Sequence, residues 1–199
     1  MPTKWMKWMR EEKQLKVHNM GGSWSAAVDK AIITFNNLGF GVKLVPEREK
    51  HKAQIVVKLS NGAEVFEQID DKIIVDFPAD GMHGRASTIA HPRRKEIYFA
   101  AVFLPGKVQN LMPKQKEVMI VHELIHACGL DGGLPDGGQD PKQDHEENGI
   151  MASKMAIAGD GLIEYFHELN TPPMTPIRVG PLTMCKMRML WAAETCAVD

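Results

Sequence analysis

The chain has 199 residues and a formal net charge of −1, so no overall field draws it to nucleic acid or to a membrane surface. Hydrophobic residues make up 44% and charged residues 25%, as in an ordinary globular protein, and no apolar run approaches the roughly 18 residues of a membrane span. This length predicts one domain with a sizeable core. Because the N-terminus lacks the apolar segment of a secretory signal, we expect a cytoplasmic protein or one released without a classical signal peptide.

The first part of the chain predicts an arm, a helix and several strands. Residues 1–20 are expected to form an N-terminal arm, whose Trp and Met side chains pack against a domain spanning residues 21–199. Ser23 is a suitable N-cap for a helix over residues 24–38, where apolar residues recur at helical spacing. Apolar and alternating segments then predict strands at residues 40–45, 53–59 and 72–77.

The next segments lead into the part of the chain that contains the candidate site. Residues 80–90 form a glycine-punctuated stretch, and residues 96–99 predict a short strand. A helix is expected to begin near Lys114, where charged residues lead into an apolar run. Later helices are predicted at residues 162–169 and 183–193.

The cysteines of the chain are Cys128, Cys185 and Cys196, and this low, odd number argues against a disulfide framework. If Cys185 and Cys196 share one helix, their spacing of about 16 Å is too long for a disulfide bond. Cys128 is expected to be a small core residue.

The helix that begins near Lys114 contains an HExxH pattern formed by His122, Glu123 and His126. On a helix, positions i and i+4 lie about 40° apart and about 6 Å along the axis, so both imidazoles point to one side. Two neutral imidazoles at this spacing can bind one Zn²⁺ at about 2.0–2.1 Å. Glu123 can then take a proton from a metal-bound water. The alternative explanation is an amphipathic helix with two partly buried, hydrogen-bonded histidines.

A turn and a loop are expected directly after this helix. Gly129 follows His126 by three residues, where a helix C-terminus favours a residue with positive φ. Residues 131–144 contain Gly, Pro and Asp without periodicity, which predicts a loop beside the cleft. The aspartates of this loop also suggest Ca²⁺, but their spacing is not that of an EF-hand, so calcium is not favoured.

The sequence HELIHACGL, followed by a histidine and then by GIM, resembles the active-site pattern of the metzincin clan of zinc endopeptidases, of the matrixin and archaelysin type. By this resemblance His122 and His126 are the first two zinc ligands, and Glu123 is the general base. Gly129 is the glycine of the pattern, and Met151 is the methionine of the Met-turn beneath the metal.

The third ligand departs from the family pattern, which places a histidine three residues after the glycine. In this chain that position is Gly132, which has no side chain. We interpret residues 131–144 as an insertion and His145 as the displaced third ligand. His145 precedes Met151 by six residues, a separation similar to that in the family.

The resemblance implies an α+β fold, a zincin-like single domain with a twisted mixed sheet, an N-terminal helix, an active-site helix and a C-terminal helix. The N-terminal subdomain would reach about residue 130, and the C-terminal subdomain would span residues 131–199. The resemblance also makes residues 84–90 an edge strand that binds substrate main chain by strand addition, and the alternative explanation for these residues is a surface loop. The residues expected at the substrate are Gly84, Arg85, Ala86 and Ser87. The implied function is a zinc-dependent endopeptidase with one catalytic Zn²⁺ and a peptide or protein substrate.

Two alternatives remain open at the level of sequence. The first is a gluzincin-like peptidase, in which a glutamate on a later helix, such as Glu164 or Glu168, replaces His145 as the third ligand. The second is a non-catalytic domain that binds zinc for structure or for interaction. Glu123 disfavours the second alternative, because a purely structural metal needs no base.

Overall fold

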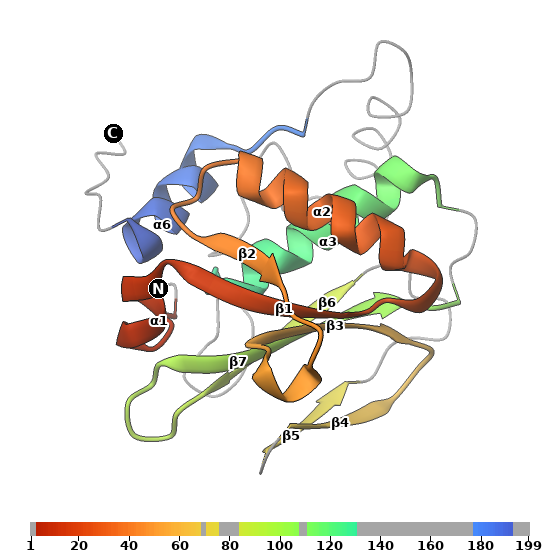
Figure 1. Cartoon of the computed structure of the whole chain (residues 1–199), viewed down its shortest axis with the longest axis horizontal. Helices are drawn as coiled ribbons and strands as arrows, with labels where there is room; N and C mark the ends of the chain where they lie inside the picture. The colour runs from red at the N-terminus through yellow and green to blue at the C-terminus, as the bar shows by residue number, and fades with distance from the viewer. Residues whose placement is uncertain (1–2, 69–70, 76–83, 108–110, 131–176, 193–199) are drawn as a thin grey trace.

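The computed structural model describes residues 3–68, 71–75, 84–107, 111–130 and 177–192, and Figure 1 shows their arrangement. The helices are α1 (Lys7–Glu12), α2 (Ser25–Asn37), α3 (Pro113–Ala127) and α6 (Pro181–Trp191), with short 3-10 helices η1 (Gly22–Trp24) and η2 (Lys50–Lys52). The strands are β1 (Gln14–Met20), β2 (Lys43–Pro46), β3 (Ile55–Ser60), β4 (Glu64–Gln68), β5 (Asp71–Val75), β6 (Arg85–Ala90) and β7 (Ile97–Pro105). None of the helices in these ranges is long and apolar enough to cross a membrane.

The centre of the fold is a five-stranded sheet with the strand order β2-β1-β3-β7-β6. Strands β2, β1, β3 and β7 pair in parallel, whereas β6 runs antiparallel to β7 at the end of the sheet. Strands β3 and β7 lie in the interior of the sheet, and their continuous apolar runs are typical of that position. A mixed sheet combined with these helices confirms the predicted α+β fold class.

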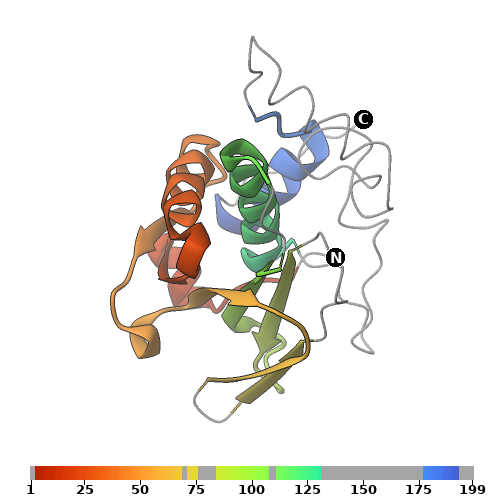
Figure 2. The same ribbon diagram turned by 90° about the vertical axis from the view of Figure 1, so that its right-hand side faces the viewer.

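Helices α2 and α3 cover one face of this sheet, as Figures 1 and 2 show. The main core lies between the two layers and includes side chains from β1, β3 and β7 as well as from both helices. Helix α6 extends this core through Met187, Leu190 and Trp191. At about 25 cal/mol per Å² of buried apolar surface, this shared core supplies the main force that fixes α3 against the sheet.

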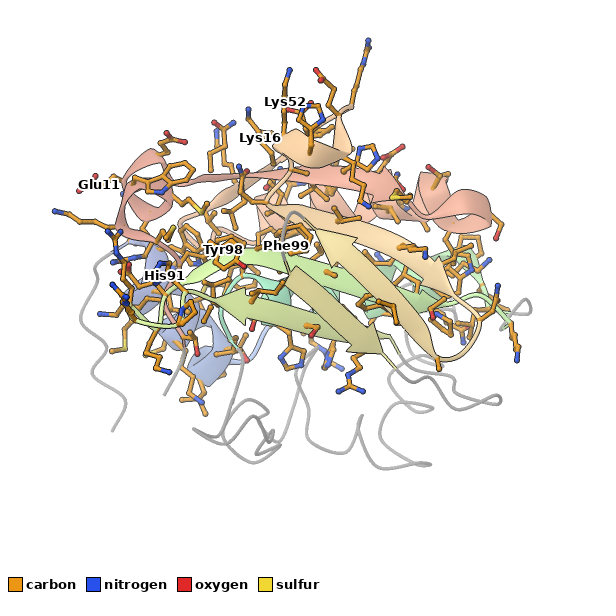
Figure 3. The ribbon with its side chains drawn as sticks, turned by 90° about the horizontal axis from the view of Figure 1, so that it is seen from below. Glu11, Lys16, Lys52, His91, Tyr98 and Phe99 are labelled. Carbon is orange, nitrogen blue, oxygen red and sulfur yellow. The ribbon has the colours of Figure 1, made fainter. Side chains whose placement is uncertain are left out.

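The opposite face of the sheet carries a second, smaller apolar cluster. Val56, Phe99 and Phe103 are buried there, together with Ala53 and Ala101. The β4–β5 hairpin, which forms a separate two-stranded sheet, lies on the side of this smaller cluster. In Figure 3 the hairpin is in front of the five-stranded sheet, and Tyr98 and Phe99 of β7 are labelled. Strand β4 was not expected, and β7 continues to Pro105 instead of ending at Phe99.

The N-terminal segment takes part in the sheet, which differs from the arm expected over residues 1–20. Residues 7–12 form α1, and residues 14–20 form β1, which pairs with β2 on one side and β3 on the other. Leu15 and Val17 of β1 are fully buried in the core. Two alternating apolar residues are too short a pattern to identify a strand from the sequence. Residues 14–20 form a strand because they pair with β2 and β3.

The expectation about disulfide bonding is wrong for one cysteine. Cys185 is disulfide-bonded, whereas Cys128 is free and fully buried, as predicted for a core residue. The argument against a bond assumed that Cys185 and Cys196 share one helix. Helix α6 ends at Trp191, so that assumption does not hold, and Cys196 itself lies outside the described residues.

Candidate metal centre

Helix α3 carries the HExxH residues. Pro113 occupies the first turn of α3, where a backbone N–H has no acceptor within the helix, so its lack of an N–H costs no hydrogen bond. The Gln115 side chain accepts a hydrogen bond from the Met112 N–H at 2.8 Å. The apolar residues of the helix are fully buried and set its rotation relative to the sheet and α2: Val118, Ile120, Val121, Leu124 and Ile125.

The two histidines of the pattern face one another. The ring centroids of His122 and His126 are 4.8 Å apart with an angle of 75° between the planes, and their Nε2 atoms are 3.2 Å apart. Two nitrogens held at about 2.05 Å from a tetrahedral ion would be about 3.3 Å apart. The rings therefore present two nitrogens at the spacing that one Zn²⁺ requires. The same distance also suits a hydrogen bond between the two rings.

The second ring nitrogen of His126 has a fixed partner. Its Nδ1 lies 2.7 Å from the backbone oxygen of Leu130. A carbonyl oxygen only accepts hydrogen bonds, so Nδ1 donates and carries the proton in the neutral ring. The lone pair of the ring is then on Nε2, which faces His122. An outer hydrogen bond of this kind is typical of metal-binding histidines, because it fixes both the tautomer and the ring orientation.

Glu123 is buried between α3 and the start of β6, with only 6% of its surface exposed. Burial raises the pKa of its carboxyl group to about 8, whereas a hydrogen bond from the Ala86 backbone and the charge of Arg85 act in the opposite direction. The Glu123 side chain fits there because Gly84, which it packs against, has no side chain. A Cβ at Gly84 would lie 2.6 Å from Cγ of Glu123 and 3.1 Å from its Cδ and Oε1.

The expected edge strand is β6, the last strand in the order of the five-stranded sheet. It pairs antiparallel with β7, from Arg85 opposite Phe103 to Ala90 opposite Ile97. Three of the residues expected at the substrate, Arg85, Ala86 and Ser87, begin β6, and Gly84, Arg85 and Ala86 lie near Glu123. Arg85 is exposed, Ser87 is half-buried and Ala86 is buried, while Gly84 immediately precedes the strand.

The end of α3 has the predicted turn. Gly129 has a φ of +107°, a conformation that residues with a side chain rarely adopt. Its N–H donates to the His126 carbonyl at 2.9 Å, and the Leu130 N–H reaches back to Ile125 at 3.4 Å. This turn brings the Leu130 carbonyl under the ring of His126.

Several predicted site residues lie outside the described residues: His145, Met151, the loop 131–144, and the alternative ligands Glu164 and Glu168. Within the described ranges, no three His, Cys, Asp or Glu side chains form a group that could bind a metal. The described part of the candidate centre thus consists of the two imidazoles, His122 and His126, and the adjacent carboxyl group of Glu123.

Some contacts at this centre were not anticipated from the sequence. The Leu130 carbonyl and the Ala86 backbone act through main-chain atoms, which carry no sequence signal. The proximity of Gly84 to Glu123 likewise depends on how β6 packs against α3.

No protein-family model matches this chain, and a search of curated proteins finds no significant match.

Proposed function

We propose that the protein is a zinc-dependent endopeptidase. The observation that carries the proposal is the pair of imidazoles on α3, with Nε2 atoms 3.2 Å apart and Nδ1 of His126 bonded to Leu130. A structural histidine pair would need no acid or base beside it. Here a carboxyl group, Glu123, is buried next to the pair at the cost of its own desolvation. We take His145 as the third ligand, as the resemblance to metzincins suggests.

Three neutral histidines would hold the ion and leave one coordination position open for water and substrate. Zinc, when bound, supplies a Lewis acid that polarises the scissile carbonyl and lowers the pKa of an adjacent water towards about 7. Glu123 accepts the proton of that water at a carboxylate oxygen and delivers it to the nitrogen of the leaving amine. Burial raises the pKa of Glu123 in the metal-free chain, and the positive charge of a bound zinc ion would lower it again, which favours the carboxylate form that accepts the proton.

Strand β6 would hold the substrate in place. An extended peptide can add to the edge of the sheet through main-chain hydrogen bonds, which bind without requiring one particular sequence. The start of β6 lies next to Glu123, so a peptide paired there would have its backbone close to the proposed base. This supports a peptide or protein substrate over a small molecule.

The experiment uses the whole chain loaded with zinc, a mixed peptide library and cleavage detected by mass spectrometry. We expect about one zinc per chain, cleavage that a chelator removes, and recovery when zinc is restored. The variant Glu123→Gln should retain zinc and lose cleavage by at least 10²-fold, the usual contribution of a general base. Glu117→Gln is the matched control, because Glu117 is a buried glutamate on the same helix and lies outside the centre.

The third ligand is tested separately by zinc stoichiometry. His145→Ala should lose zinc, whereas Glu164→Ala should keep it; the reverse result would favour the gluzincin-like alternative. Zinc binding without any cleavage in the parent chain would favour the non-catalytic alternative. Cleavage by Glu123→Gln at the rate of the parent would refute the mechanism.

A further inference from the structure

The C-terminal end of α3 is held by two indole groups from opposite ends of the chain. Trp5 Nε1 donates to the Ala127 carbonyl at 3.1 Å, and Trp191 Nε1 donates to the Cys128 carbonyl at 2.9 Å. Both tryptophans are buried, and their ring centroids are 6.5 Å apart. Figure 1 shows α1 and α6 together at this end of the molecule.

A third contact from the N-terminal segment continues the series. The Thr3 N–H donates to the Gly129 carbonyl at 3.0 Å, and a Cβ at Gly129 would overlap the Thr3 carbonyl oxygen. The last carbonyls of a helix lack partners within the helix and are often left to water. Here the carbonyls of residues 127, 128 and 129 each accept a donor from another part of the fold.

These carbonyls immediately precede the one that holds the candidate ligand. His126 Nδ1 donates to Leu130 O at 2.7 Å, and Leu130 follows directly after the fixed peptide units. A displacement of the Leu130 oxygen by about 0.8 Å would stretch this bond to the 3.5 Å limit of a hydrogen bond. The direction of the Leu130 carbonyl therefore depends on how the backbone of residues 127–129 is held.

We propose that Trp5 and Trp191 are positioning residues for the metal centre. Their indole N–H groups fix the backbone after α3, this backbone aims the Leu130 carbonyl, and the carbonyl sets the tautomer and orientation of His126. The tryptophans donate to the backbone carbonyls of Ala127 and Cys128, so in this proposal they act on His126 through Leu130. The proposal rests on the proposed function in naming zinc as the ion, whereas the effect on the His126 ring does not require zinc.

The test compares Trp5→Phe and Trp191→Phe, which keep an aromatic ring but remove the N–H donor. Trp24→Phe is the matched control, since Trp24 is equally buried but packs near Lys116, towards the beginning of α3. Circular dichroism establishes that each full-length variant is folded at the measuring temperature. If one variant fails to fold, the other carries the test, because each indole fixes a different carbonyl.

The first measurement is metal-free: long-range ¹H–¹⁵N NMR at pH 8 reports which ring nitrogen of His126 bears the proton. We expect the Nδ1–H tautomer in the parent and in Trp24→Phe, and a mixture of tautomers in Trp5→Phe and Trp191→Phe. The second measurement is zinc affinity by competition with a chelator. We expect it to weaken about 10-fold in the two variants, at the low end for loss of outer-shell support.

The outcomes separate this proposal from the proposed function. An unchanged tautomer in both variants overturns the positioning role, whatever the zinc affinity does. A changed tautomer with unchanged zinc affinity overturns the claim that the tryptophans support metal binding. If the tautomer changes in the variants but the parent chain binds no zinc, the positioning of His126 is upheld. The same result rejects the zinc centre.

Discussion

The substitution Gly84→Ala tests the packing of Glu123 directly. The added Cβ would lie 2.6 Å from Cγ of Glu123, about 1 Å inside the ordinary contact distance between carbon atoms. Cγ is only two bonds from the helix backbone, so it can move away only by a change of rotamer in a buried position. We expect the free energy of unfolding to fall by about 1–3 kcal/mol, the usual cost of overpacking a well-packed site.

The assay is a double-mutant cycle measured by urea denaturation. In a Glu123→Ala background the overlapping atoms are absent, so Gly84→Ala should be neutral or should stabilise by up to about 1 kcal/mol through the reduced entropy of the unfolded chain. Under the proposed function, Gly84→Ala alone should also lower kcat/KM by about 10²-fold, because it displaces the base by about 1 Å. Equal destabilisation in both backgrounds would refute the packing argument.

Two further predictions concern Glu117 of α3 and Gly129 in the turn after this helix. Burial alone would raise the pKa of Glu117, but the hydrogen bond from Thr34 and the charges of Lys114 and Lys30 outweigh it, so the pKa is lowered in the folded protein. Glu117→Gln should lower the free energy of unfolding by about 1–3 kcal/mol at pH 7. On acidification the unfolded chain takes up the proton first, so the difference in stability between variant and parent should shrink as pH falls through the lowered folded pKa, below 4.5. A difference in stability that is constant with pH contradicts this. Gly129→Ala should lower the free energy of unfolding by about 1–3 kcal/mol, because of the positive φ of Gly129 and the overlap with Thr3. Under the proposed function it should also weaken zinc binding. Thermal denaturation tests the strain argument, which a variant as stable as the parent would contradict.

Several elements could be predicted because their signal is local. The helix that carries His122 and His126 was placed to within a residue at its start, since Pro113 and the apolar run after it specify a helix by themselves. Gly129 was assigned a positive φ on the same grounds, because a glycine after a helix is a local feature. The edge position of residues 84–90 followed from the resemblance, and β6 occupies that position.

Other features were missed because they depend on partners distant in the sequence. Strand β1 carries only Leu15 and Val17 as buried apolar residues and becomes a strand by pairing with β2 and β3. The bond of Cys185 was argued against from an assumed single helix, yet α6 ends before residue 196.

By itself, the sequence determined that two imidazoles and a carboxyl group lie on one helix, since a period of 3.6 residues per turn fixes the direction of side chains four positions apart. The tertiary structure alone decided how these groups are held. Gly84 and Ala86 pack against Glu123, and the Leu130 carbonyl orients His126. Trp5 and Trp191 donate to the backbone carbonyls of residues 127 and 128, which lie between His126 and Leu130. Such contacts join residues up to 122 positions apart, and their partners are often main-chain atoms that every residue possesses. No local pattern of side chains encodes them, so only the folded chain reveals them.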